Sequence, residues 1–177
     1  MKDVNALIEE LRTLISTSEF SAAERFQTAV NRIAAFLADA FGGEKSEVAI
    51  LWNRGESLSF LWPDFLAEAK ELSIKSKLSI AATIFRSGRS FLDNRLMERE
   101  HMVEYEFVKE SDGESRRIWK MMGAAITVEG ERLGVVQISR KRSAYNEPGP
   151  DFTPADLDLL EKLTTRLGAF MKAVIPF

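Results

Sequence analysis

The chain has 177 residues, and its 24 lysine and arginine residues against 27 aspartate and glutamate residues give a formal net charge of −3. This slight acidity disfavours nucleic acid as the main partner, because phosphate neutralisation needs a basic surface. The composition, 45% hydrophobic and 29% charged, is typical of one ordinary globular domain. The absence of cysteine excludes disulfides, zinc–thiolate sites, iron–sulfur clusters and cysteine nucleophiles.

The N-terminus is charged from the second residue and has no long apolar run, so the sequence predicts no signal peptide. No segment approaches the roughly 20 consecutive apolar residues that a membrane span requires. We therefore expect no membrane association and a cytoplasmic protein.

Two amphipathic helices are predicted at the start of the chain. The first lies within residues 1–18; the second begins at Ser21, which has capping-box spacing to Glu24, and ends at Gly42-Gly43. The apolar stripe of the first helix has heptad spacing, which favours a dimer contact. The alternative is that the same face packs on the domain. This stripe consists of Val4, Leu7, Leu11 and Leu14.

Two hairpins are predicted from alternating or apolar runs that flank turn residues. The first joins residues 48–52 to 58–62, and the second joins 121–128 to 133–138 through Glu129-Gly130-Glu131. Both runs of the second hairpin are almost wholly apolar, so we expect it in the middle of the sheet. A short helix follows Ser79, and a last helix begins at Thr153-Pro154.

Three segments resemble GAF domains. The run from Met122 to Ile138 (MGAAITVEGERLGVVQI) is similar to the late hairpin of that family, residues 82–91 (ATIFRSGRSF) to its helix, glycine and strand, and residues 152–156 (FTPAD) to the start of its last helix. The resemblance implies an α+β, GAF-like (PAS-like) fold. In it, a central antiparallel sheet carries the N- and C-terminal helices on one face and a variable ligand-pocket segment on the other. Residues 1–18 would form an N-terminal amphipathic helix and 19–177 the GAF-like domain.

The resemblance also implies a sensory or regulatory module without catalytic activity. Bilin-binding members attach the pigment to a cysteine, and members that reduce methionine sulfoxide use cysteine chemistry, so both are excluded here. Haem-binding members use a histidine ligand, and the single histidine of this chain, His101, is the one candidate. With Glu104 it has the spacing of two ligands on one helix face, but a charged solvated face is the commoner reason for such a run. We expect no cofactor and no metal.

A partial match exists to the motif of cyclic-nucleotide GAF domains, Asn-Lys followed by Phe-x-x-x-Asp-Glu. Lys141, Phe152 and Asp156 match it, whereas Arg140 and Leu157 depart from it. Asp156 also has a sufficient structural role, because a carboxylate in the first turn completes a helix cap. We interpret the basic clusters Arg116-Arg117 and Arg140-Lys141-Arg142 as solvated surface or partner contacts.

Aromatic and polar residues on the predicted strands are candidates for a ligand pocket, since such pockets combine apolar walls with a few polar groups. The aromatic candidates are also ordinary core residues of a half-buried sheet, and Asp93-Asn94 is also an ordinary turn. The aromatic candidates are Trp52, Phe60, Trp62 and Trp119, and the polar ones are Asp93, Asn94, Arg95 and Thr127.

Two functions follow as hypotheses. In the first, an unidentified small molecule binds the domain, closes residues 93–115 over the sheet and biases a homodimer contact. In the second, the fold has lost its ligand and serves as a dimerisation or docking module. Either would pass its signal to a separate output protein.

Overall fold

The computed structural model describes residues 3–16, 20–66, 71–98, 117–142 and 147–175. Within these ranges the chain forms four α-helices, six strands and three short 3-10 helices. The helices are α1 (Val4–Ser16), α2 (Ala22–Ala40), α3 (Ile80–Ser87) and α4 (Pro154–Val174). The strands are β1 (Val48–Asn53), β2 (Ser57–Trp62), β3 (Leu72–Ser73), β4 (Phe91–Asp93), β5 (Arg117–Val128) and β6 (Glu131–Arg142). The 3-10 helices are η1 (Lys45–Glu47), η2 (Asp64–Leu66) and η3 (Leu96–Glu98).

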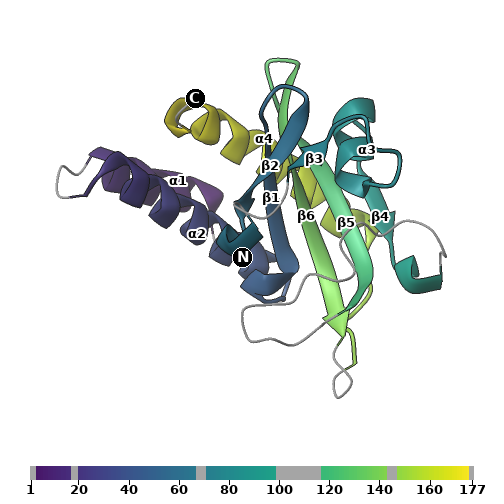
Figure 1. Cartoon of the computed structure of the whole chain (residues 1–177). Helices are drawn as coiled ribbons and strands as arrows, with labels where there is room; N and C mark the ends of the chain where they lie inside the picture. Colours follow the sequence, from purple (N-terminus) through teal and green to yellow (C-terminus); the bar gives the residue numbers. More distant parts are fainter. Residues whose placement is uncertain (1–2, 17–19, 67–70, 99–116, 143–146, 176–177) are drawn as a thin grey trace.

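The strands make one antiparallel sheet in the order β3-β2-β1-β6-β5-β4 (Figure 1). Both predicted hairpins are confirmed, as β1–β2 and β5–β6, and β1 pairs with β6 to join them. The tight turn between β5 and β6 uses Glu129 and Gly130, both at positive φ (52° and 84°). Such a turn matches the twist of the flanking strands. The apolar second hairpin therefore supplies the middle of the sheet, as its sequence predicts.

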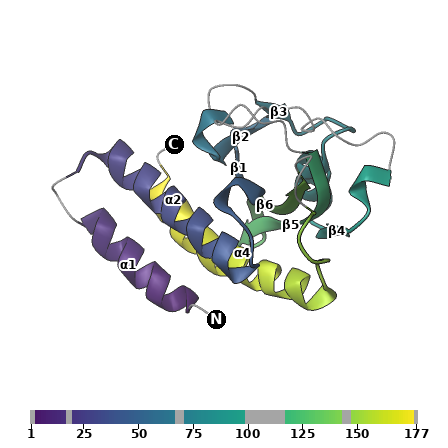
Figure 2. The same cartoon turned by 90° about the horizontal axis from the view of Figure 1, so that it is seen from below.

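Three helices, α1, α2 and α4, lie together on one side of the sheet (Figure 2). They bury the larger apolar cluster against alternate residues of the central strands, for example Ile50, Ile126 and Ile138. This arrangement favours the second interpretation of the first helix, in which its apolar face packs on the domain. Leu7 and Leu11 are buried in the chain's own core, Leu11 completely, while Val4 and Leu14 are half-buried against it. The alternative interpretation, packing of this face on the domain, holds for the described chain.

The helices begin where the sequence provides caps. Ser21 and Glu24 form a reciprocal capping box at α2, and Thr153 and Asp156 form another at α4. The Ser21 hydroxyl and, next in effect, its backbone N–H donate to the Glu24 carboxylate, and they hold the pKa of Glu24 below its ordinary value of 4.5. These caps satisfy backbone donors that the first helical turn leaves without partners. They also fix the entry of each helix onto the sheet.

The opposite face of the sheet carries a smaller apolar cluster covered by α3, η2 and η3. It contains Leu51, Phe60, Met121 and Val135 from the strands and Ile84 from α3. Neighbouring residues of one strand thus serve different faces, since Ile50 and Trp52 belong to the helix side and Leu51 to this side. The candidate site lies on this second face.

Candidate functional site

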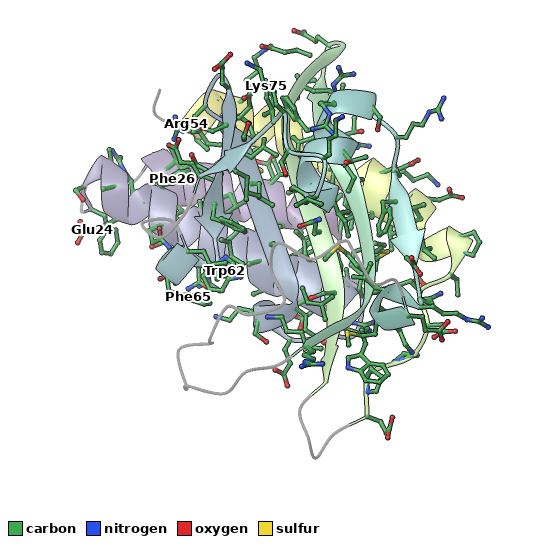
Figure 3. The ribbon with its side chains drawn as sticks, turned by 45° about the vertical axis from the view of Figure 1, so that its right-hand side comes forward. Glu24, Phe26, Arg54, Trp62, Phe65 and Lys75 are labelled. Carbon is green, nitrogen blue, oxygen red and sulfur yellow. The ribbon has the colours of Figure 1, made fainter. Side chains whose placement is uncertain are left out.

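A cavity of about 60 Å³ lies on the second face of the sheet, beside η2. Strands β1, β2, β5 and β6 supply its walls, and residues 63–66 border it. Most of the lining is apolar, and Phe65, which is 41% exposed, lies at the edge of the molecule in the view of Figure 3. The lining residues are Ser46, Glu47, Val48, Ala49, Phe60, Pro63, Phe65, Leu66, Ile118, Met121, Gln137, Ser139 and Lys141.

Strand β6 supplies three polar residues of this cavity, Gln137, Ser139 and Lys141. They alternate along the strand, and residues two apart on a strand share a face. The Ser139 hydroxyl donates to the carbonyl of Glu47 at 3.1 Å. The Lys141 ammonium donates to the carbonyl of Ser46 at 2.6 Å. The cavity therefore combines these polar groups with the apolar side chains of Phe60, Leu66 and Met121.

Gln137 is the most deeply buried polar side chain in the cavity, with 4% of its surface exposed. It occupies the middle of β6, opposite Ala49 of β1 and Gly123 of β5. Its amide nitrogen donates to the sulfur of Met121 at 3.3 Å. A thioether is a weak acceptor, so this contact replaces little of the hydration that the amide loses on burial.

Glu47 connects the cavity with the helix layer. Its carboxylate accepts hydrogen bonds from the backbone N–H of Lys141 (2.8 Å) and of Glu44 (3.1 Å). The guanidinium of Arg140 lies 3.7 Å from the same carboxylate. Gly43 permits this approach, because a Cβ there would lie 2.6 Å from Nη1 of Arg140 and 2.7 Å from Oε2 of Glu47.

Arg140 corrects the interpretation of its basic cluster as solvated surface. Its side chain is 4% exposed. The guanidinium donates to the carbonyl of Phe41 at the end of α2 and lies 4.5 Å from the centroid of the Phe152 ring. Buried arginines need such partners, because an unpaired buried charge is costly. Arg117 is exposed, as expected for a surface residue.

The predicted aromatic lining divides between the two faces. Phe60 lines the cavity. Trp52 is buried in the helix-side core, and Trp62 packs against that core while its indole N–H donates to the carbonyl of Lys45 at 2.9 Å. Trp119 is half-buried on β5, at a shift in register, and does not line the cavity. The core alternative therefore holds for both Trp52 and Trp62.

The predicted polar residues lie beside the cavity or farther away. Asp93 ends β4 at the edge of the sheet, is 7% exposed, and pairs in register with the cavity residue Met121 of β5. Asn94 donates to the carbonyl of Phe152 and accepts from its N–H, both at 2.9 Å, so it fastens this edge to the segment before α4. Arg95 is exposed, and Thr127 is half-buried at the β5–β6 turn. None of these four residues lines the cavity.

The partial cyclic-nucleotide motif is also dispersed. Lys141 lines the cavity, but Phe152 is buried beneath Arg140 on the helix side, and Asp156 accepts from the backbone N–H of Thr153 at 2.7 Å. Its half-buried neighbour Leu157 packs on the helix-side core. The cap alternative for Asp156 holds. His101 and Glu104 lie outside the described residues.

A second hollow, of about 390 Å³, lies on the outer surface of the helix layer. Phe36 and Ala40 of α2 and Leu159 and Leu163 of α4 form its apolar floor, and Val4 borders it. Charges of both signs surround it, from Asp3, Lys162 and Arg166. An adjoining hollow of about 310 Å³ lies between α1 and α2.

Comparison with known proteins now decides the family. The model of the GAF domain family matches residues 22–170, which is most of the chain. The chain belongs to the GAF domain family. No curated protein sequence matches it significantly.

Solved structures agree with this GAF fold. A methyl-accepting chemotaxis protein (residues 122 to 287) is 16% identical with a TM-score of 0.67, covering 95% of this chain and 96% of that one. The GAF domain of an Acinetobacter phosphoenolpyruvate-protein phosphotransferase is 13% identical with a TM-score of 0.64, covering 98% and 95%. The type II free methionine-R-sulfoxide reductase of Thermoplasma acidophilum is 9% identical with a TM-score of 0.61, covering 88% and 98%. GAF domains are generally sensory or regulatory, and these identities establish the fold alone.

Two features are absent from the described residues, a metal-ligand cluster and a membrane-spanning helix. No three His, Asp or Glu side chains of residues 3–16, 20–66, 71–98, 117–142 and 147–175 cluster as metal ligands would. In the same part of the GAF domain, no helix has the length and apolar character needed to cross a membrane.

Sequence reasoning missed Gln137, Ser139 and Glu47 as cavity residues. The signal for Gln137 was present, since it is the one amide in the apolar run Leu133–Ile138. A polar residue in a central strand needs a reason, because burial of an amide costs free energy. For Glu47 the sequence held no such signal, because it lies in the polar segment between α2 and β1, which forms η1.

Proposed function

We propose that this GAF domain is a non-catalytic, small-molecule-sensing regulatory module whose ligand biases dimer or partner contacts. The observation that carries the proposal is the cavity between β1, β2, β5, β6 and η2, whose mainly apolar lining includes the buried amide of Gln137. Ligand sites typically combine apolar walls with a few polar groups in this way. The cytoplasmic location stays a prediction from the sequence.

Contacts between the cavity and the helices support the regulatory part of the proposal. Glu47 borders the cavity, and Arg140, 3.7 Å away, donates to the last turn of α2 and packs on Phe152 just before α4. A ligand that displaces Glu47 would change the partners of a buried guanidinium. The positions of α2 and α4 would then depend on occupancy, which is the differential contact that a ligand-controlled switch requires.

A non-enzymatic role is also part of the proposal. One related structure is a reductase. The family's reductases use cysteine chemistry, however, and this chain contains no cysteine. The cavity residues Gln137, Ser139 and Lys141 include no nucleophile paired with a histidine base.

Native mass spectrometry of the protein as purified tests this function. We expect an added mass that disappears on denaturation, and this mass would identify the chemical class of the ligand. A protein that carries no added mass, and that gains none from a metabolite extract, would contradict the sensing role.

The second candidate is a GAF module that acts only through dimerisation or docking. The hollow across α2 and α4 favours it, because its apolar floor and mixed charges suit a second copy of the same surface. Leu159→Glu should then reduce the fraction of dimer in the native mass spectrum. Thr165→Glu, at an exposed position of α4 outside the hollow, should leave that fraction unchanged. A dimer fraction that Leu159→Glu does not change would exclude this hollow as the dimer interface.

A further inference from the structure

The chemical class of the ligand can be argued from Gln137, on the basis that the cavity is the sensing site proposed above. Gln137 is 4% exposed and lines the cavity together with Phe60 and Met121, which belong to the smaller apolar cluster. A side-chain amide has two N–H donors and a carbonyl oxygen with two lone pairs. Among the described residues its hydrogen bonding is limited to one contact, the donation to the Met121 sulfur at 3.3 Å.

This bonding is poor for a buried amide. Sulfur accepts weakly, so the protein offers the Gln137 amide much less than water would. A leucine at this position would fill the strand without that loss. Gln137 therefore contributes little to the stability of the fold. Its amide lines a cavity in which a ligand can complete its hydrogen bonds.

The charges around the cavity favour an uncharged ligand. The Glu47 carboxylate already accepts from the backbone N–H groups of Glu44 and Lys141 and lies 3.7 Å from Arg140. The Lys141 ammonium donates to the Ser46 carbonyl. Both charged groups thus already have partners within the protein, and a charged ligand would have to displace one of these contacts to be paired. A neutral molecule needs no such exchange.

The size of the cavity limits the apolar part of the ligand. Its volume is about 60 Å³, less than half of the about 150 Å³ that accommodates benzene in an engineered apolar cavity. A short branched alkyl group suits Phe60, Leu66 and Met121 better than an aromatic ring does.

We infer that the cavity binds a small uncharged molecule that carries an amide group on a short apolar chain. The Gln137 N–H donates to the ligand carbonyl in place of the Met121 sulfur, and the ligand N–H donates to the Gln137 carbonyl. Two amides exchange hydrogen bonds in this way because each offers one donor beside one acceptor. The apolar chain of the ligand lies against Met121.

Three probes with the same branched carbon skeleton test the class: isobutyramide, isobutyrate and isobutylammonium, each at neutral pH. The methyl group of Met121 reports binding directly in ¹³C-methyl-methionine NMR of the full chain, with its signal assigned from Met121→Leu. We expect isobutyramide to shift this signal with an affinity about tenfold above that of either charged probe.

Gln137→Leu is the decisive variant. It should reduce isobutyramide binding about tenfold, because it removes the amide that binds the probe. It should not lower the thermal midpoint of unfolding, because that amide is poorly hydrogen-bonded within the protein. The matched control is Thr164→Val, which removes a buried hydroxyl on the helix side and should leave probe binding unchanged.

Each other outcome overturns the inference. A lower thermal midpoint for Gln137→Leu would make Gln137 a structural residue. Equal or tighter binding of isobutyrate or isobutylammonium would contradict the neutral class while leaving a ligand cavity. No shift of Met121 with any probe would exclude amides from this cavity, whereas the sensing function itself stands or falls with the mass spectrum of the purified protein.

Discussion

The two faces of the central sheet use the same strands for different purposes. The face beneath α1, α2 and α4 is filled by apolar side chains such as Ile50, Ile126 and Leu160, all essentially fully buried. The opposite face has a smaller apolar cluster, a cavity and the buried amide of Gln137. Close packing stabilises a fold, whereas cavities and poorly bonded polar groups cost stability. We therefore expect the helix face to determine stability and the cavity face to determine binding.

The largest effect is expected from Leu11→Glu on α1. Leu11 is completely buried against the helix-side core, so the free energy of unfolding should fall by at least the about 2–5 kcal/mol of a buried Leu→Ala change, since a charge is added as well. Urea unfolding measures it. Val4→Glu, at a half-buried position beside the surface hollow, is the control and should cost much less. A stable, folded monomer from Leu11→Glu would instead restore this stripe as a dimer contact.

The difference in packing between the two faces of the sheet can be tested by enlarging one alanine side chain on each face. Ala124 lies on the helix face and is 1% exposed, so Ala124→Leu should overpack a filled core and destabilise the protein by about 1–3 kcal/mol. Ala49 lines the cavity, so Ala49→Val should change stability by less than about 0.5 kcal/mol. Urea midpoints of the two variants give the difference. Equal losses would mean that the cavity face is packed as closely as the helix face.

The sequence predicted most of the fold because local signals determine it. The capping residues Ser21 and Thr153 begin α2 and α4 as expected, and the alternation of Val48, Ile50 and Trp52 correctly places them on one face. Alternation cannot tell which face is covered by helices and which holds a cavity. For that reason Trp52 and Trp62 are candidates for both the pocket and the core in the sequence, and the structure places both on the core side.

The site was predicted less well because it depends on strand order. Phe60 of β2 and Lys141 of β6 both line the cavity, with β1 between their strands. Asp93 and Thr127 are polar candidates by residue type and by the family resemblance, and neither lines the cavity, although Asp93 pairs with the cavity residue Met121. Arg140 looked like surface in a basic cluster. Its burial depends on Phe41 and Phe152, which contact it from distant parts of the chain.

A smaller effect is expected at the edge of the sheet, where Asn94 joins β4 to the segment before α4. Asn94→Ala leaves the N–H and carbonyl of Phe152 without their partner and should cost about 1–3 kcal/mol in urea unfolding. Arg95→Ala is the control at an exposed neighbour and should cost less than about 0.5 kcal/mol. Neither variant should alter ligand binding, because both positions lie outside the cavity. A loss of binding in Asn94→Ala with unchanged stability would return Asn94 to the site.

The smallest effect is expected at the outer end of α2, far from the cavity, where Figure 3 shows Glu24. Hydrogen bonds from Ser21 hold the pKa of Glu24 below its ordinary value of 4.5 in the folded protein. A carboxyl group with a lowered folded-state pKa stabilises the protein above its unfolded-state pKa, and this contribution disappears as the pH falls through the folded-state pKa. Glu24→Gln should therefore lower the thermal midpoint slightly at pH 7, and its difference from the unaltered protein should shrink as the pH falls below about 4.5. Gln27→Glu, an exposed change one turn later on the same helix, controls for charge near the helix start.

A difference in thermal midpoint that grows on acidification would contradict the capping role of Glu24. A change in ligand binding would contradict the separation between the helix face and the cavity.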